Sequence, residues 1–273
     1  MRIKRFISAF LLLTVLFTFC GCGVKQNIET DYTEETTSNV VRITFREGIT
    51  ARGIAEKLEK NGVCGAESFI AELNKTEYLE LFGIDIASPG NRMYLLEGYL
   101  FPDTYDFYLG EKPSSVLKKF LVNMKSKFSI DVIQRCNELG LTTDELLTVA
   151  SIVQRECGNG RDDGKVASVI FNRLENSPNA RLQCDSTSFY LRENIKPHVD
   201  EEKYSFYVDL YSTYDTGGLP EGPINNCGMG AIKAVLYPEQ TDYQFFVTDN
   251  SGNFYFSETY AEHLSNCTKA GIY

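Results

Sequence analysis

The chain has 273 residues, 43% of them hydrophobic, so it can bury one large core or a small domain beside a medium one. Its formal net charge is −10 at pH 7, which argues against a nucleic-acid-binding protein and against electrostatic adhesion to anionic lipid. Work at a membrane would therefore require a covalent or spanning anchor.

The N-terminus has the features of an export signal. Three of the first five residues are basic, and residues 6–24 carry no charge. The sequence FCGC at the end of this run resembles a bacterial lipobox, in which Cys22 would be the lipidated first residue of the mature protein. A single spanning helix is the alternative, because a bilayer requires ~20 apolar residues. We expect residues 1–22 to be a lipoprotein signal or membrane anchor.

Residues 23–40 are polar, acidic and rich in Thr, which predicts a disordered tether. Beyond it lie six cysteines with wide spacings and no CxxC pair, and we favour buried free thiols over disulfides. His198 and His263 are the only histidines, and no HExxH motif is present, so the sequence predicts neither a metal site nor another cofactor.

A small α+β subdomain is predicted for residues 41–90. Thr50 is a good N-cap for the first of two short helices. The preceding residues, VVRITF, favour a β-strand. This order resembles LysM, a small βααβ module that binds glycan chains. The expected strand, two helices and returning strand lie at residues 40–45, 51–61, 66–73 and 91–96.

The remainder, residues 91–273, predicts a mixed α+β domain, so the fold class of the whole chain is α+β. The glycine- and proline-rich loop at residues 217–226 is long, and such loops are more often functional than idle. Apolar periodicity and capping residues predict helices at residues 113–128, 142–156, 163–174 and 231–237, and alternation predicts a hairpin at 243–248 and 253–257.

Two carboxylates occupy apolar surroundings. Glu97 lies in LLEGYLFPDTY, which predicts a strand over Leu95–Phe101; burial there would raise its pKa toward that of a general acid. Tyr99 could offer a flat face to a sugar ring. A solvated Glu97, or one paired with Arg92, is the alternative. Glu156 falls on the apolar face of its helix, so it is either paired in the core or turned into a cleft.

Six stretches of the chain together resemble the MltG (YceG-like) family of endolytic murein transglycosylases. They occur in family order over residues 41–263: LLEGYLFPDTY, ASIVQRE, FNRL, LQCDST, GLPEGPINN and YQFFVTDNSGNFYFSETYAEH. The resemblance implies cleavage of the β-1,4 bond between N-acetylmuramic acid and N-acetylglucosamine within nascent peptidoglycan strands. The cut would be non-hydrolytic and would leave a 1,6-anhydro-muramoyl end.

The resemblance also implies roles for individual residues. Glu97 matches the family's catalytic glutamate, which would protonate the glycosidic oxygen and then deprotonate the C6 hydroxyl of the muramoyl sugar. Other matching positions are expected around the cleft as substrate contacts or supports. Together with Tyr99, these are Glu156, Gln183, Asp185, Thr187, Tyr214 and Asn226.

Two other functions stay open at this point. A muramidase-type hydrolase would use Glu97 with Glu156 or Asp185 as a second carboxylate. A non-catalytic glycan-binding scaffold of the wall-synthesis machinery would keep the cleft only. The expected partners are peptidoglycan strands and the membrane through the N-terminal anchor, and the family resemblance also implies a penicillin-binding peptidoglycan synthase. The expected location is the outer face of a bacterial cytoplasmic membrane.

Overall fold

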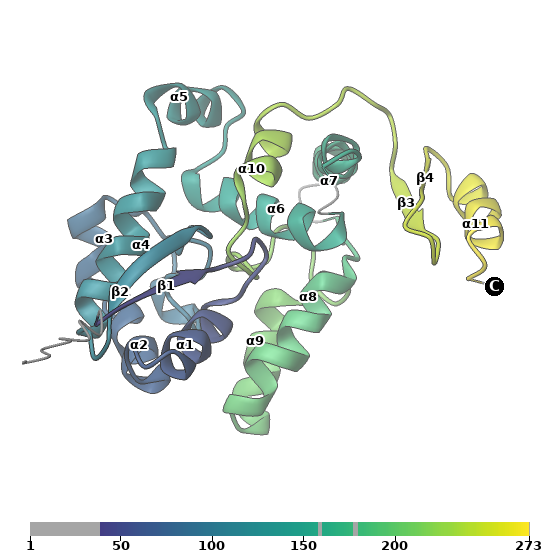
Figure 1. Ribbon diagram of the computed structural model, residues 1–273. Helices are drawn as coiled ribbons and strands as arrows, with labels where there is room; N and C mark the ends of the chain where they lie inside the picture. The colour runs from purple at the N-terminus through teal and green to yellow at the C-terminus, as the bar shows by residue number, and fades with distance from the viewer. Residues whose placement is uncertain (1–38, 158–159, 177–179, 273) are drawn as a thin grey trace, which may run out of the picture. The chain divides into compact units, whose positions relative to one another are not determined.

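The computed structural model describes residues 39–157, 160–176 and 180–272 (Figure 1). The expected anchor with Cys22, and the expected tether up to residue 38, lie outside these described residues. Within the described ranges, no helix combines the length and apolarity that a membrane span needs.

The first elements confirm the predicted strand and two helices. The Thr50 hydroxyl accepts a hydrogen bond from the Gly53 N–H, and Ile54, Ala55 and Leu58 of the following helix are buried. A third helix and a 3-10 turn were not predicted. The elements are β1 (Val40–Thr44), α1 (Ala51–Lys60), α2 (Ala66–Leu73), α3 (Glu77–Phe82) and the 3-10 turn Pro89–Asn91.

The predicted strand around Glu97 is wrong, and the segment at 91–96, expected to return beside the first strand, does not pair with it. Residues 95–98 form a turn, and the antiparallel partner of β1 is β2 (Thr104–Tyr108). The reason lies at Gly98, whose φ is +87° and where a Cβ would lie 2.5 Å from Pro223. The missing side chain therefore makes room for the loop that carries Pro223.

A group of helices follows, with α6 at its centre. Residues 146–153 of α6 are all buried, and the helix packs against α7 and α10. The capping box of Thr142 and Glu145 that begins α6 confirms its prediction. The helices are α4 (Pro113–Lys127), α5 (Ile130–Glu138), α6 (Thr143–Glu156), α7 (Asp163–Asn176), α8 (Asp185–Tyr190), α9 (Glu201–Tyr211) and α10 (Met229–Leu236).

Two of these elements differ from expectation. α5 was not predicted. The segment after α8 was not predicted either: it contains a π-helical turn (Leu191–Ile195) that continues α8, a 3-10 turn (Lys196–His198) and the start of α9.

The chain ends in a hairpin and a helix that share a small core of their own. β3 (Phe245–Thr248) pairs antiparallel with β4 (Phe254–Ser257), as predicted, and α11 (Tyr260–Lys269) packs on both strands (Figure 1). Val247, Cys267 and Ala270 form that core. The six cysteines in the described residues are free thiols. Helices with two small antiparallel sheets confirm the α+β class.

Candidate active site

Glu97 is enclosed by protein. Glu97 is 1% exposed. Its Oε1 accepts hydrogen bonds from the Ala51 N–H (2.9 Å) and from Asn226 Nδ2 (2.8 Å). Burial raises the pKa of Glu97 to about 8, although the hydrogen bonds from Ala51 and Asn226 act in the opposite direction. Glu97 itself does not line any of the four best-formed cavities in the described chain, but Tyr190, which hydrogen-bonds its carboxyl group, lines one of them, with a volume of about 220 Å³.

The partners of Glu97 connect segments that are distant in the sequence. Ala51 is the first residue of α1, so its N–H has no partner within the helix. Asn226 also accepts a hydrogen bond from the Leu100 N–H (2.8 Å) and pairs through its backbone with Ile49. Glu97 and Asn226 thus hold the start of α1, the turn before β2 and the 217–226 loop together.

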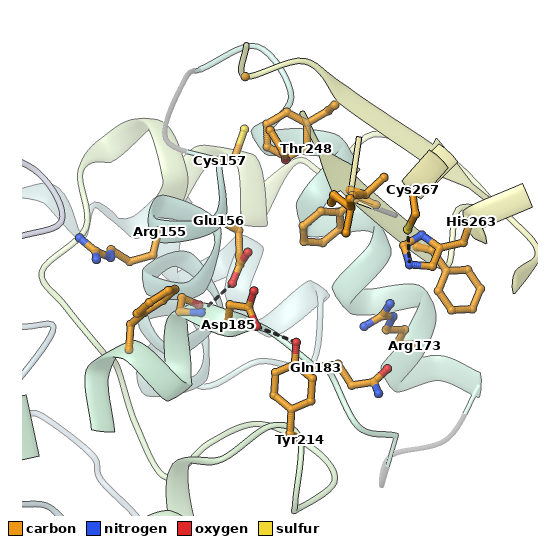
Figure 2. A pocket seen from close by; sticks show the side chains of 18 of the residues that line it. Arg155, Glu156, Cys157, Arg173, Gln183, Asp185, Tyr214, Thr248, His263 and Cys267 are labelled. Atoms are coloured by element: carbon orange, nitrogen blue, oxygen red, sulfur yellow. Dashed lines mark hydrogen bonds between the residues drawn. The ribbon is translucent and has the colours of Figure 1, made fainter. Parts of the chain in front are cut away.

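The largest of the four cavities has a volume of about 830 Å³, within the ~300–1,000 Å³ that is typical of ligand sites. Its walls come from two parts of the chain (Figure 2). One wall comprises the end of α6, α7 and the start of α8. The other comprises β3, β4 and α11. We call this cavity the main pocket.

Glu156, the last residue of α6, lines the main pocket (Figure 2). Its Oε1 accepts a hydrogen bond from the Ser186 N–H (3.1 Å). Burial raises the pKa of Glu156, and the nearby negative charge of Asp185 raises it further. Glu156 therefore combines access to a cavity with a tendency to hold its proton.

Asp185, Tyr214 and Gln183 share the main pocket with Glu156. The Tyr214 hydroxyl donates to Asp185 Oδ1 at 2.7 Å, which fixes that carboxylate at the start of α8. Gln183 is the one non-glycine residue in the described ranges with a positive φ, 50°, and its N–H donates to the Thr213 carbonyl (3.0 Å). A strained backbone at a cavity is a common feature of functional sites.

Three of the residues expected around the cleft lie elsewhere. Asn226 is buried beside Glu97. Thr187 is also buried, and its hydroxyl donates to the Cys184 carbonyl (2.9 Å). Tyr99 donates to Asp144 Oδ1 (2.8 Å) and faces a separate apolar cavity.

The suggested pairing of Arg92 with Glu97 is contradicted, because Arg92 forms its ion pair with Asp144. Its guanidinium also donates to the Glu221 carbonyl, so it fixes the 217–226 loop instead.

One wall of the main pocket is aromatic, and the sequence alone did not predict it. The rings of Phe245 and His263 stack with centroids 5.1 Å apart, and the Arg173 guanidinium lies 5.3 Å from the Phe245 ring centroid. Tyr260 joins the same wall. Arg173 and His263 occur in the FNRL and ETYAEH stretches, but no local pattern indicated that these stretches meet.

No cluster of three His, Cys, Asp or Glu side chains suited to a metal ion occurs among the described residues.

Comparison with known proteins gives a consistent result. The profile of the YceG-like family matches residues 25–269. The chain is similar to the endolytic murein transglycosylase of Bacillus subtilis (strain 168), with 33% identity over 202 residues, which are 72% of this chain and 53% of that protein. It is also similar to the endolytic murein transglycosylase of Streptococcus pneumoniae (strain ATCC BAA-255 / R6), with 28% identity over 227 residues, or 81% and 39%.

The chain thus spans about half the length of these curated relatives, or less. A crystal structure of a yceG-like protein from Listeria monocytogenes has a TM-score of 0.71 and 26% sequence identity, and the match covers 82% of this chain and 75% of that one. With a family match over most of its length, the chain belongs to the YceG-like family.

Proposed function

We propose that this chain is a lytic transglycosylase of murein, and that Glu156 is its proton-transfer residue. The observation that carries the assignment is that Glu156 is a carboxylate of raised pKa that lines the main pocket. Glu97, the residue that the family resemblance favoured, is 1% exposed and does not line the main pocket. The names of the curated relatives supply the substrate, which is the glycan strand of murein.

The first step needs a general acid. Protonated Glu156 gives its proton to the oxygen of the β-1,4 bond between N-acetylmuramic acid and N-acetylglucosamine. The bond from the muramoyl C1 to that oxygen breaks, and N-acetylglucosamine leaves with a free hydroxyl. Burial favours the protonated state that this step uses.

The second step needs a general base at the same place. Glu156, now a carboxylate, takes the proton of the muramoyl C6 hydroxyl while that oxygen bonds to C1. The product is a 1,6-anhydro-muramoyl end, and Glu156 regains its starting proton. One carboxyl group suffices because the internal hydroxyl replaces water.

Neighbours of Glu156 support both steps. The Ser186 N–H at 3.1 Å stabilises the carboxylate form between the steps. Asp185, held by the Tyr214 hydroxyl, opposes full ionisation of Glu156 through its own negative charge. The wall of Phe245, Tyr260 and His263 offers flat faces to sugar rings.

For Glu97 we propose a positioning role. Its carboxyl group joins α1 to the loop of Asn226, and Ile224 and Asn225 of that loop hydrogen-bond Ser151 in the middle of α6. Loss of Glu97 would therefore disturb the helix that carries Glu156 without removing the proton carrier.

One observation favours a second candidate function. Asp185 lies in the same pocket as Glu156, and a pair of carboxylates is what a glycoside hydrolase uses. A muramidase would produce reducing ends, whereas a transglycosylase produces anhydro ends. The lipid anchor at Cys22, the location at the outer membrane face and the synthase partner stay predictions.

The test is mass spectrometry of fragments released from uncrosslinked peptidoglycan by the full chain in mild detergent. Wild type should release anhydro-ended fragments, and Glu156→Gln should release almost none. The matched control is Glu202→Gln on α9, because Glu202 is exposed and lines none of the four cavities. Reducing-ended fragments would establish the hydrolase, and full activity of Glu156→Gln would remove Glu156 from the mechanism.

A further inference from the structure

The outer face of the β1–β2 sheet changes from polar to apolar along its length. Three cross-strand pairs have exposed side chains on this face: Thr44 with Thr104, Arg42 with Asp106, and Val40 with Tyr108. The first pair shares a hydrogen bond of 2.8 Å between its hydroxyls, and the second forms an ion pair of 2.8 Å. Such polar pairs are expected on a sheet face that meets water. The third pair is apolar, although Val40 is 41% and Tyr108 60% exposed.

Leu109 extends this apolar end of the sheet. It follows β2 directly and is 53% exposed. Its side chain lies over the turn after α1, where a Cβ at Gly62 would be 3.4 Å from Leu109 Cδ2. We call Val40, Tyr108 and Leu109 the terminal patch. Single exposed apolar residues are ordinary, but a group of them on a surface that is otherwise polar indicates a contact surface.

The terminal patch lies where the described chain begins. Asn39 is the first described residue, and its carbonyl accepts a hydrogen bond of 2.8 Å from the Leu109 N–H. Residues 25–38 separate Asn39 from the uncharged run at 6–24, for which an anchor is expected. A chain of that length reaches at most ~50 Å, and a flexible one spans ~20 Å on average. An anchor in that run therefore keeps the patch close to a bilayer.

The chemistry of the patch and its surroundings suits the interface of a bilayer. Tyrosine is enriched at membrane interfaces because its ring is apolar and its hydroxyl can stay in water. Two exposed lysines flank the patch in the chain: Lys60 at the end of α1 and Lys112 before α4. Lysine stems can lie along apolar surface while the ammonium group stays among the headgroups. The charge of Glu111 in the same turn is paired with Lys119 at 2.8 Å.

We propose that the terminal patch is a contact surface for the interfacial layer of a lipid bilayer, and that it orients the domain on the membrane. Three side chains are too few to attach a protein whose net charge is −10, so the anchor supplies the attachment and the patch selects the face that meets the lipid. This inference rests on the expected anchor and is independent of which glutamate transfers the proton.

The test uses the fact that the chain contains no tryptophan. Leu109→Trp therefore introduces a single reporter into the terminal patch. The full chain carrying this substitution is reconstituted into phosphatidylcholine vesicles, with and without phosphatidylcholine brominated near the headgroup end of its acyl chains. The bromine should quench about half of the emission, because side chains at an interface reach ~5–10 Å into the headgroup and acyl boundary. The emission should also shift to shorter wavelength than in detergent-free buffer after proteolytic release from the vesicles.

Three further reporters make the result specific. Tyr108→Trp keeps an aromatic ring in the patch and should be quenched as Leu109→Trp is. Thr104→Trp is the matched control on the same sheet face, at the opposite end of β2, and should be quenched much less. Phe206→Trp is the remote control, because Phe206 is 46% exposed on α9, and it should not be quenched.

Equal quenching of Leu109→Trp and Phe206→Trp would show that the domain has no preferred face toward the lipid and would overturn the proposal. So would unquenched emission from both patch reporters in vesicle-bound protein. Quenching that disappears in high salt would contradict an apolar contact. Failure of the full chain to sediment with vesicles would remove the anchor and the proposal together. None of these outcomes bears on the proposed function, because the release of anhydro-ended fragments is measured separately.

Discussion

Two glutamates in this molecule have raised pKa values, and their surroundings differ in one decisive respect. Glu97 is closed off by α1, α8 and the 217–226 loop, and the groups that hydrogen-bond it, among them Ala51, Tyr190 and Asn226, come from the protein itself. Glu156 is hydrogen-bonded by Ser186 at the start of α8 and otherwise borders a cavity of about 830 Å³. A raised pKa therefore does not by itself identify a general acid. Access of a substrate to the carboxyl group is the second requirement.

The comparison also distinguishes buried hydrogen bonds that stabilise the fold from buried hydrogen-bonding groups that border a ligand cavity. Around Glu97, hydrogen bonds link segments far apart in the sequence, so they contribute to the free energy of unfolding. Around Glu156, the hydrogen-bonding groups come from the adjacent start of α8 and border a cavity, so they can also meet a ligand. The following variants test this division.

Glu97→Ala should lower the free energy of unfolding by about 2–5 kcal/mol, because it leaves a cavity and removes the acceptor for two buried donors. Glu97→Gln should cost much less, since it keeps the volume and an acceptor oxygen. Chemical denaturation of both variants measures the difference. Equal, small losses for the two would mean that Glu97 does not hold these segments together.

The stability of wild type should depend on pH through Glu97. Its folded pKa of about 8 lies above the ordinary value of 4.5, so the folded state retains a proton that the unfolded state has lost. The stabilisation by this proton is complete below about 4.5 and disappears as the pH rises to about 8. Denaturation at about pH 5 and about pH 8 should show a larger fall for wild type than for Glu97→Gln. Parallel falls would contradict the raised pKa.

Gly98→Ala should destabilise the protein by about 1–3 kcal/mol through its backbone alone, since φ is +87°, and the clash with Pro223 adds to this. Gly230→Ala on α10 is the control, because a Cβ there meets nothing within 4 Å. Thermal unfolding of both variants gives the comparison. A neutral Gly98→Ala would show that the loop carrying Pro223 can move away freely.

Tyr214→Phe tests the smallest expected effect, which concerns the surroundings of Glu156 in the main pocket. It removes the hydrogen bond that holds Asp185 and should cost about 0.5–1.5 kcal/mol in transition-state stabilisation, or a severalfold loss of kcat/KM. The free energy of unfolding should change little, since the residue is 39% exposed. A loss of stability without a change in kcat/KM would place Tyr214 outside the reaction.

The sequence allowed correct prediction of the elements that have local signals. The capping box at Thr142, the N-cap at Thr50 and the apolar periodicity of α4 all lie within a few residues of the helix that they define. The strand around Glu97 was wrong because alternation of apolar residues cannot show that Gly98 must take a positive φ under Pro223.

The site was harder to predict because it depends on contacts between distant segments. Sequence periodicity left Glu156 either in the core or in a cleft, and only the packing of α6 against the start of α8 places it in the main pocket. The wall of Phe245 and His263 depends on where the terminal hairpin and α11 lie. Conversely, the apolar sequence around Glu97 indicated burial correctly but could not show that the burial is complete.

The most direct test of this account compares turnover by Glu156→Gln and Glu97→Gln, both verified as folded, on the same uncrosslinked peptidoglycan near neutral pH. At that pH Glu97 is largely protonated, so the amide is a close mimic of its native state. We predict a loss of about 10²–10⁴-fold in the rate of anhydro-end formation for Glu156→Gln and a change within a few fold for Glu97→Gln. The reverse order of losses would return the proton transfer to Glu97 and contradict the central claim.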